Sequence, residues 1–279
     1  MKLVYPLYPL GALLLGSALA APTALPVSAT GHGYDAPTRV QAGYVQLRFS
    51  NASKMPVDIG IFRLKPGVTD AQFRTVGAQV ATNAAKDATD RLNHMVDALG
   101  GVGDVQPGNS DSATLYLTPG RYVLASLDAD DTTHKTALSM GYFREINVRG
   151  PALKNAPAAA DYRIRMVDYR FELPQGVRAG THTWRVLNSG QEPHFALLAR
   201  LLPGKTFKDA MASLMKNDQQ GPPPVDFEHS VYAQVLTHGQ SEDVSWNLSA
   251  GHYVVVCFVD NKQGVPHALM GMAQELVVR

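Results

Sequence analysis

Four side chains of metal-ligand type lie in the second half of the chain, namely His194, Cys257, His267 and Met272. Cys257 is the only cysteine, and it lies in the apolar run 253–259. The length of this run, with its β-branched and aromatic residues, favours a strand. A period of two places Tyr253, Val255, Cys257 and Val259 on one face. A polar turn, His267, Met272 and a second expected strand at 275–278 follow. Thiolate, imidazole and thioether groups at strand ends suit a soft metal such as copper.

A trigonal copper site with a weak axial methionine requires a second imidazole. His194 is the candidate, because it ends the turn-forming segment Asn188-Ser189-Gly190-Gln191-Glu192-Pro193-His194. The alternative interpretation of a lone cysteine is a small buried hydrophobic residue with no ligand role. The spacing of the two histidines and the methionine around Cys257 favours the metal site.

These segments carry a family resemblance. Gly-x-Tyr-x-x-x-Cys, followed by Pro-His-x4-Met and an apolar strand, resembles the end of a blue-copper (cupredoxin) domain. Asn-x-Gly-x-x-Pro-His resembles the loop that supplies the first histidine in that family. The resemblance covers the second half of the chain and implies one type 1 copper held by His194, Cys257, His267 and Met272. The nine residues between Cys257 and His267 resemble the spacing in copper nitrite reductases more than that in small electron carriers.

The N-terminal residues predict the location of the protein, and the net charge bears on its possible partners. Residues 1–20 have a basic start, an apolar run and Ala18-Leu19-Ala20, which predicts a cleaved signal peptide and a periplasmic or extracellular protein. No later stretch is long and apolar enough to span a bilayer. With 25 basic and 24 acidic residues and a net charge of +1, the composition does not indicate nucleic acid as a partner.

The chain contains an internal repeat. Ala42-Gly43 and 63–69 match Ala179-Gly180 and 200–206 at one offset, since 180 − 43 and 200 − 63 both give 137. Further on, Gly120-Arg121-Tyr122 matches Gly251-His252-Tyr253 at an offset of 251 − 120 = 131, and 145–148 matches 275–278 at 130. Ordered matches with small changes of offset predict two copies of one unit that differ in loop length.

We expect corresponding elements in each copy. In the first, strands are expected at 44–49 and 57–64, helices from Asp70 and over 85–99, and a hairpin of 114–118 with 122–127. In the second, strands are expected at 182–187 and 195–201, a helix at 207–215, and a hairpin of 243–248 with 253–259. Many short strands with Gly/Pro turns predict an all-β fold of two tandem Greek-key β-sandwiches, each with a short inserted helical segment. The expected domains are 21–149 and 161–279, joined by a linker at 150–160.

The first copy serves as an internal control for the site. The shared offsets align Val57, Ser126, Ala137 and Tyr142 with His194, Cys257, His267 and Met272, so the first copy lacks the ligand set. Met270 is a rival to Met272, but it has a counterpart in Met140, which favours a packing role. Six further histidines, at positions 32, 134, 182, 229, 238 and 252, are expected to lie outside the site.

The predicted function is outer-sphere electron transfer through one copper in an exported protein, with an unknown redox partner and His267 as the expected point of electron exit. Four protein ligands leave no open position for substrate, so we do not expect an enzyme. The chain also lacks the paired His-x-His motifs that a multicopper oxidase needs. Two alternatives remain open, a metal-free β-sandwich interaction module and a copper storage or delivery protein.

Overall fold

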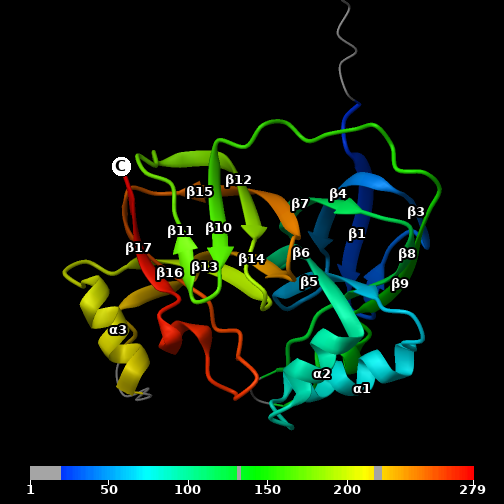
Figure 1. Ribbon diagram of the computed structural model, residues 1–279, viewed down its shortest axis with the longest axis horizontal. Helices are drawn as coiled ribbons and strands as arrows, with labels where there is room; N and C mark the ends of the chain where they lie inside the picture. The colour runs from blue at the N-terminus through cyan, green and yellow to red at the C-terminus, as the bar shows by residue number, and fades with distance from the viewer. Residues whose placement is uncertain (1–19, 131–132, 217–221) are drawn as a thin grey trace, which may run out of the picture.

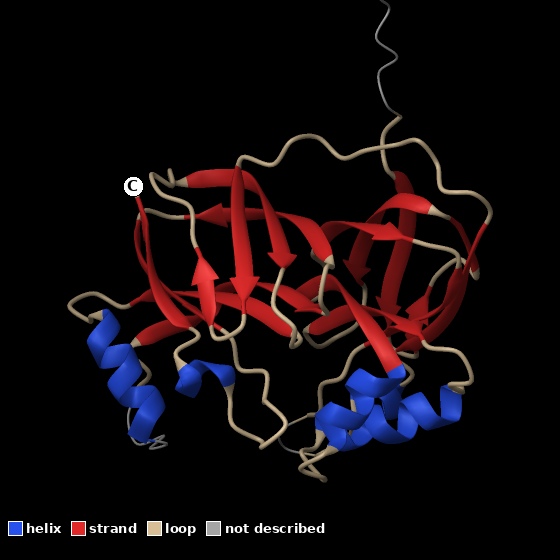
Figure 2. Ribbon diagram, viewed as in Figure 1, coloured by secondary structure: helices blue, strands red, loops and turns tan. Residues whose placement is uncertain are grey.

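The computed structural model describes residues 20–130, 133–216 and 222–279; except for Ala20, the predicted signal peptide lies outside them. The described chain forms two stacked β-sheets with helices on one side (Figure 1, Figure 2). The predicted all-β sandwich class is therefore confirmed. No helix in these ranges is long and apolar enough to cross a membrane.

Both sheets run through both halves of the chain. The eight-stranded sheet has the order β11 (Arg170–Glu172), β10 (Tyr162–Val167), β12 (Gly180–Asn188), β15 (Ser241–Leu248), β7 (Ser110–Leu117), β4 (Gly43–Asn51), β1 (Thr23–Thr30) and β2 (Gly33–Asp35). The nine-stranded sheet has the order β17 (Ala273–Val278), β16 (Gly251–Val256), β13 (His194–Leu201), β14 (Val225–Leu236), β6 (Val96–Val105), β5 (Val57–Leu64), β8 (Gly120–Ala125), β9 (Phe143–Arg149) and β3 (Arg39–Gln41).

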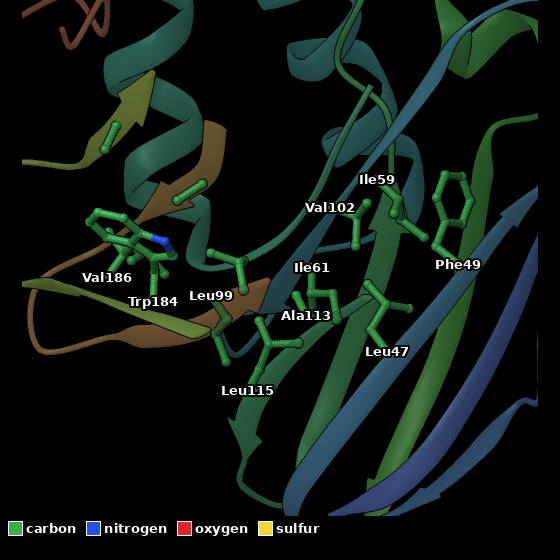
Figure 3. Close-up of a cluster of buried hydrophobic side chains, with 14 of the residues drawn as sticks. Leu47, Phe49, Ile59, Ile61, Leu99, Val102, Ala113, Leu115, Trp184 and Val186 are labelled. Carbon is green, nitrogen blue, oxygen red and sulfur yellow. The ribbon is translucent and has the colours of Figure 1, made fainter. Parts of the chain in front are cut away.

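One continuous core fills the space between the sheets. Inward side chains from both halves belong to a single buried cluster. Figure 3 labels Leu47, Phe49, Ile59, Ile61, Leu99, Val102, Ala113, Leu115, Trp184 and Val186 among them. Trp184 on β12 is fully buried and packs against Trp246 on the neighbouring strand β15, with ring centroids 5.5 Å apart. Alternation along each strand directs every second side chain into this layer, as the sequence predicts.

In the described part of the chain, three α-helices cover the outer face of the nine-stranded sheet. Helices α1 (Asp70–Ala81) and α2 (Ala88–Met95) bury apolar residues against β5, β6 and β8, and α3 (Phe207–Lys216) does so against β13 and β16. Helix α1 is capped at its N-terminus, where Thr69 and Gln72 form a reciprocal capping box. Two 3₁₀ turns, η1 (Ala137–Met140) and η2 (His267–Met270), occupy matching places before β9 and β17.

Two predictions of local structure were wrong. The helix expected over 85–99 ends at Met95, and 96–105 forms the central strand β6, which pairs with β5 and touches β14. The expected closing hairpins do not form, because β7 and β15 lie in one sheet while β8 and β16 lie in the other. A strand's sequence indicates which of its faces is buried, but not which sheet it joins.

The two halves meet through one strand pair in each sheet. Residues Ala113–Leu115 of β7 pair antiparallel with 242–244 of β15, and Leu99 of β6 pairs with Leu236 of β14. The segment 150–160, expected to be a linker, is anchored by the buried Asn155, whose side chain bonds both backbone groups of Tyr44. The division into two domains at this segment stays a prediction.

Hydrogen bonds recur at corresponding positions of the two halves. Asn51 Nδ2 donates to the carbonyls of Met55 and Val105, and Asn188 Nδ2 donates to those of Glu192 and Leu236. The hydroxyl groups of Tyr122 and Tyr253 each donate a hydrogen bond to the backbone carbonyl of the residue four positions earlier. The backbone N–H of Ser126 bonds the Tyr142 carbonyl, as that of Cys257 bonds the Met272 carbonyl, both at 3.2 Å. These residues hold the same turns in both halves.

Candidate metal centre

His194, Cys257 and His267 converge between the sheets in the second half of the molecule. His194 begins β13, Cys257 directly follows β16, and His267 begins η2. All three side chains are fully buried, and their ligand atoms lie within 4.8 Å of one another. Residues separated by up to 73 positions in the sequence therefore meet at one end of the sandwich.

Short backbone hydrogen bonds fix the three elements relative to one another. The N–H of His267 bonds the Val259 carbonyl at 2.9 Å, and the N–H of Ala268 bonds the Cys257 carbonyl at 2.8 Å. Met272 completes the loop, because its N–H bonds the His267 carbonyl at 3.0 Å and its carbonyl accepts from Cys257. The site is therefore built on a strand end and a closed 3₁₀ turn, which limits its freedom.

Met272 is fully buried and belongs to the same apolar cluster as Cys257. The rival Met270 is 40% exposed, and its sulfur accepts a hydrogen bond from Asn261 at 3.0 Å. Burial thus distinguishes the two methionines, although Met270 is exposed and does not have the packing role that its match with Met140 predicted. The counterparts in the first half, Val57, Ser126, Ala137 and Tyr142, are also buried, so non-ligand side chains occupy the corresponding interior.

The two imidazoles present the same nitrogen to the thiol. His194 Nδ1 lies 3.0 Å from His267 Nδ1, and the Cys257 sulfur lies 3.9 Å from the first and 3.7 Å from the second. Typical metal bonds of about 2.0 Å to nitrogen and about 2.3 Å to sulfur would span these distances at angles of about 97°, 130° and 119°. Their sum, about 346°, lies between the tetrahedral and the planar trigonal values. The three donors therefore fit a single ion.

Each imidazole forms a hydrogen bond with a carboxylate through Nε2, the ring nitrogen that does not face the thiol. His194 Nε2 lies 3.1 Å from Asp168 Oδ1, and His267 Nε2 lies 2.8 Å from Glu192 Oε2. Partial burial raises the pKa of Asp168, but hydrogen bonds from the backbone of Gln191 and Glu192 and from His194 lower it overall. An ionised carboxylate accepts a hydrogen bond from Nε2–H, which keeps the proton on Nε2 and leaves the lone pair on Nδ1.

Tyr169 and Gly190 support these carboxylates. The Tyr169 hydroxyl donates to Glu192 Oε1 at 3.1 Å, and its ring meets the His267 ring edge-on at 5.3 Å. Tyr169 adopts a left-handed backbone conformation (φ 63°) in the turn between β10 and β11, which is uncommon for a bulky side chain. A Cβ at position 190 would lie 2.3 Å from Asp168 Oδ1, so only glycine leaves room for this contact.

The electrostatics of the donors suit an ion better than an empty interior. Burial raises the pKa of the Cys257 thiol to about 12, and it lowers the pKa of His194 although Asp168 opposes this. Two imidazole lone pairs 3.0 Å apart repel each other unless a cation or a proton lies between them. A bound metal ion would satisfy both nitrogens and would take the place of the thiol proton.

The sequence predicted the donors but missed the carboxylates. Glu192 lies inside the loop quoted for His194, whereas Asp168 and Tyr169 lie on a hairpin 26 and 25 residues before it, with no spacing signal. The ring of His267, the expected point of electron exit, is fully buried, and Glu192 and Tyr169 cover it. The other described histidines do not join the cluster; His252, for example, bonds Glu275 on the surface.

Of the three comparisons with known proteins, only that with solved structures gives matches, which include blue copper proteins at low TM-scores. A scan against protein-family models finds no match. A search of curated proteins finds no match either. Among solved structures, dithionite-reduced auracyanin from Roseiflexus castenholzii is 17% identical, with 42% of this chain and 94% of that chain covered and a TM-score of 0.29. Auracyanin A, a blue copper protein from Chloroflexus aurantiacus, is 22% identical, with 42% and 96% covered and a TM-score of 0.28.

A multicopper oxidase structure matches along most of the chain. It is 14% identical, with 92% of this chain and 88% of that chain covered, and the TM-score is 0.24. These TM-scores are too low to support an assignment. The fold class and the candidate site therefore rest on the strands and side chains of this chain itself.

Proposed function

We propose that the chain is a copper-binding protein of cupredoxin type that transfers electrons without binding a substrate at the metal. The observation that carries this proposal is the convergence of two Nδ1 atoms and one thiol sulfur, 3.0, 3.7 and 3.9 Å apart, in a fully buried site. One thiolate and two imidazoles in a near-trigonal arrangement are the donor set of type 1 copper. Copper, when bound, would supply one-electron redox chemistry.

The residues of the chain have separate roles in this proposal. His194, Cys257 and His267 would bind the ion, and the buried Met272 would be the fourth ligand. The carboxylates of Asp168 and Glu192 keep the Nδ1 lone pairs directed at the thiol and make the imidazoles more basic. The closed apolar surroundings, which include Val255, exclude water and resist rearrangement between two oxidation states.

Electron exchange is proposed to pass through the layer that covers His267. That ring has no exposed surface, whereas Tyr169 is partly exposed and contacts it edge-on. A redox partner would therefore dock over the β10–β11 turn. Export to the periplasm or the extracellular space, and the absence of catalysis at the metal, belong to the same proposal.

The repeat gives the first half a supporting role in the proposal. The matching hydrogen bonds of Asn51 and Asn188, and of Tyr122 and Tyr253, favour two copies of one unit divided at 150–160. Because the halves share both sheets, the first half would stabilise the copper-binding half directly.

Addition of Cu(II) to the mature protein tests the proposal. We expect one copper per chain and an intense thiolate-to-copper absorption band near 600 nm, as the family resemblance implies. Cys257→Ser should abolish the band, whereas His182→Gln, which changes a histidine outside the cluster, should leave it intact. Tight but colourless Cu(I) binding would favour storage, and no stoichiometric binding would favour the interaction module.

Glu192→Gln tests the positioning role separately. A glutamine can still approach His267 Nε2 but carries no charge, so the imidazole becomes less basic. We expect copper affinity to fall by about 10- to 100-fold while the band persists at saturating copper. An unchanged affinity and an unchanged reduction potential would show that this carboxylate does not act on the metal site.

A further inference from the structure

Three carboxylates cluster in the half of the molecule that lacks the thiol. Asp58 lies on β5, Asp104 on β6 and Asp128 in the segment after β8. Each offers one oxygen, and the three oxygens lie within 4.8 Å of one another. This cluster is separate from the His194, Cys257 and His267 site and has no role in it.

The burial and hydrogen bonding of Asp58 are a second observation, independent of the clustering of the carboxylates. The residue is only 7% exposed, and its Oδ2 accepts from Gln234 Nε2 at 2.6 Å. Its Oδ1 is buried and makes no hydrogen bond of normal geometry within the described part of the chain, although the Ser126 hydroxyl is close enough to favour the charged carboxylate. A buried carboxylate oxygen without a donor is costly, and such a group normally binds a proton or a cation.

The charges around Asp58 also favour the binding of a proton or a cation there. Burial raises the pKa of Asp58 well above its usual value, and the carboxylates of Asp128 and Asp104 raise it further. Burial also raises the pKa of Asp104. Within residues 20–130, 133–216 and 222–279, no basic side chain forms an ion pair with Asp58 or Asp104.

Comparison of the two halves shows that the fold itself does not need these carboxylates. The offset of 137 aligns Asp58 with Phe195, and the offset of 131 aligns Asp104 with Val235 and Asp128 with Val259. The second half thus has three apolar residues where the first half has three acids. A cavity of about 380 Å³ adjoins the cluster and is lined by Asp58 and Asp128 together with Phe195 and Val259.

We propose that Asp58, Asp104 and Asp128 bind a hard divalent cation, with Ca²⁺ as the expected ion. The donors are all oxygens, which suits Ca²⁺ and not Cu(I). Oxygens within 4.8 Å of one another can all lie at the usual Ca²⁺ distance of about 2.4 Å, with water completing the shell. With Asp104 and Asp128 exposed, an affinity on the order of 10⁻⁴ to 10⁻³ M is expected.

Calorimetric titration of the full mature chain, freed of metal with a chelator, tests this site. We expect one Ca²⁺ per chain, and a rise in Tm of about 5 °C in 10 mM Ca²⁺. Asp104→Asn should weaken Ca²⁺ binding at least 10-fold. Glu228→Gln, which removes an exposed carboxylate elsewhere, should bind as the unchanged protein does. No Ca²⁺-dependent rise in Tm, or the same rise in both variants, would overturn the proposal.

Asp58→Asn provides a second and independent measurement. It should abolish the response to Ca²⁺, yet in EDTA it should be at least as stable as the unchanged protein, because the amide carries no buried charge. A variant that is destabilised in EDTA and still binds Ca²⁺ would show that Asp58 has only a structural role. Because neither experiment involves copper, the result is independent of the proposed electron-transfer function.

Discussion

Replacement of Glu242 by glutamine should remove a large part of the pH dependence of stability. Glu242 lies on β15 at the junction of the two halves and is 1% exposed. Its Oε2 accepts from the Gly101 N–H on the opposite sheet at 2.7 Å, and its Oε1 has no partner within the described residues. Burial raises the pKa of Glu242 to about 8, and Asp243 and Asp111 add to the rise.

The sign and size of the effect follow from the two pKa values. Between the ordinary value of 4.5 and the folded value of about 8, the folded chain keeps a proton that the unfolded chain has released. The free energy of unfolding therefore falls by about 1.4 kcal/mol for each pH unit in this window. Because 8 − 4.5 = 3.5, the total is about 5 kcal/mol, fully present below pH 4.5 and lost above pH 8.

Denaturant unfolding at several values between pH 5 and pH 8.5, in EDTA, measures this difference. The Glu242→Gln variant has no proton to lose, so its stability should decline less with pH than that of the unchanged chain. The raised pKa values of Asp58 and Asp104 act in both proteins and cancel in the comparison. Parallel curves over the whole range would refute the assignment of a protonated, buried Glu242.

Four further substitutions test the structure and the site. Asn188→Ala and Asn51→Ala each remove equivalent buried hydrogen bonds, so each should lower the free energy of unfolding by about 1–3 kcal/mol in denaturant. Only Asn188→Ala should also weaken copper binding, because it frees the loop before His194. Gly190→Ala places a Cβ 2.8 Å from His194 Nε2 and should reduce copper affinity at least 10-fold in a competition assay; equal affinity would contradict the tight packing there. Trp184→Ala should lower the free energy of unfolding by about 3–5 kcal/mol, and a loss below about 1 kcal/mol would contradict its place in the shared core.

Local patterns were sufficient to predict most elements of the fold. The strand at 57–64 and the helix from Asp70 follow from periodicity, and the structure adds a capping box of Thr69 and Gln72 at the start of that helix. By contrast, 96–99, the first residues of β6, were predicted as the end of a helix. The pairing of β6 with β5 and β14 outweighs the helical pattern before it, and Gly100 and Gly101 suit strand positions with positive φ close to Glu242 and Ile59.

The sequence by itself determined which residues are available as soft ligands, and the repeat indicated which half contains them. It could not determine that β7 and β15 join one sheet while β8 and β16 join the other, because side-chain alternation is the same in either case. Only the tertiary structure brought Asp168 and Glu192 behind the two imidazoles and gathered three aspartates in the other half. Contacts between side chains far apart in sequence depend on how sheets stack, and no local pattern records that geometry.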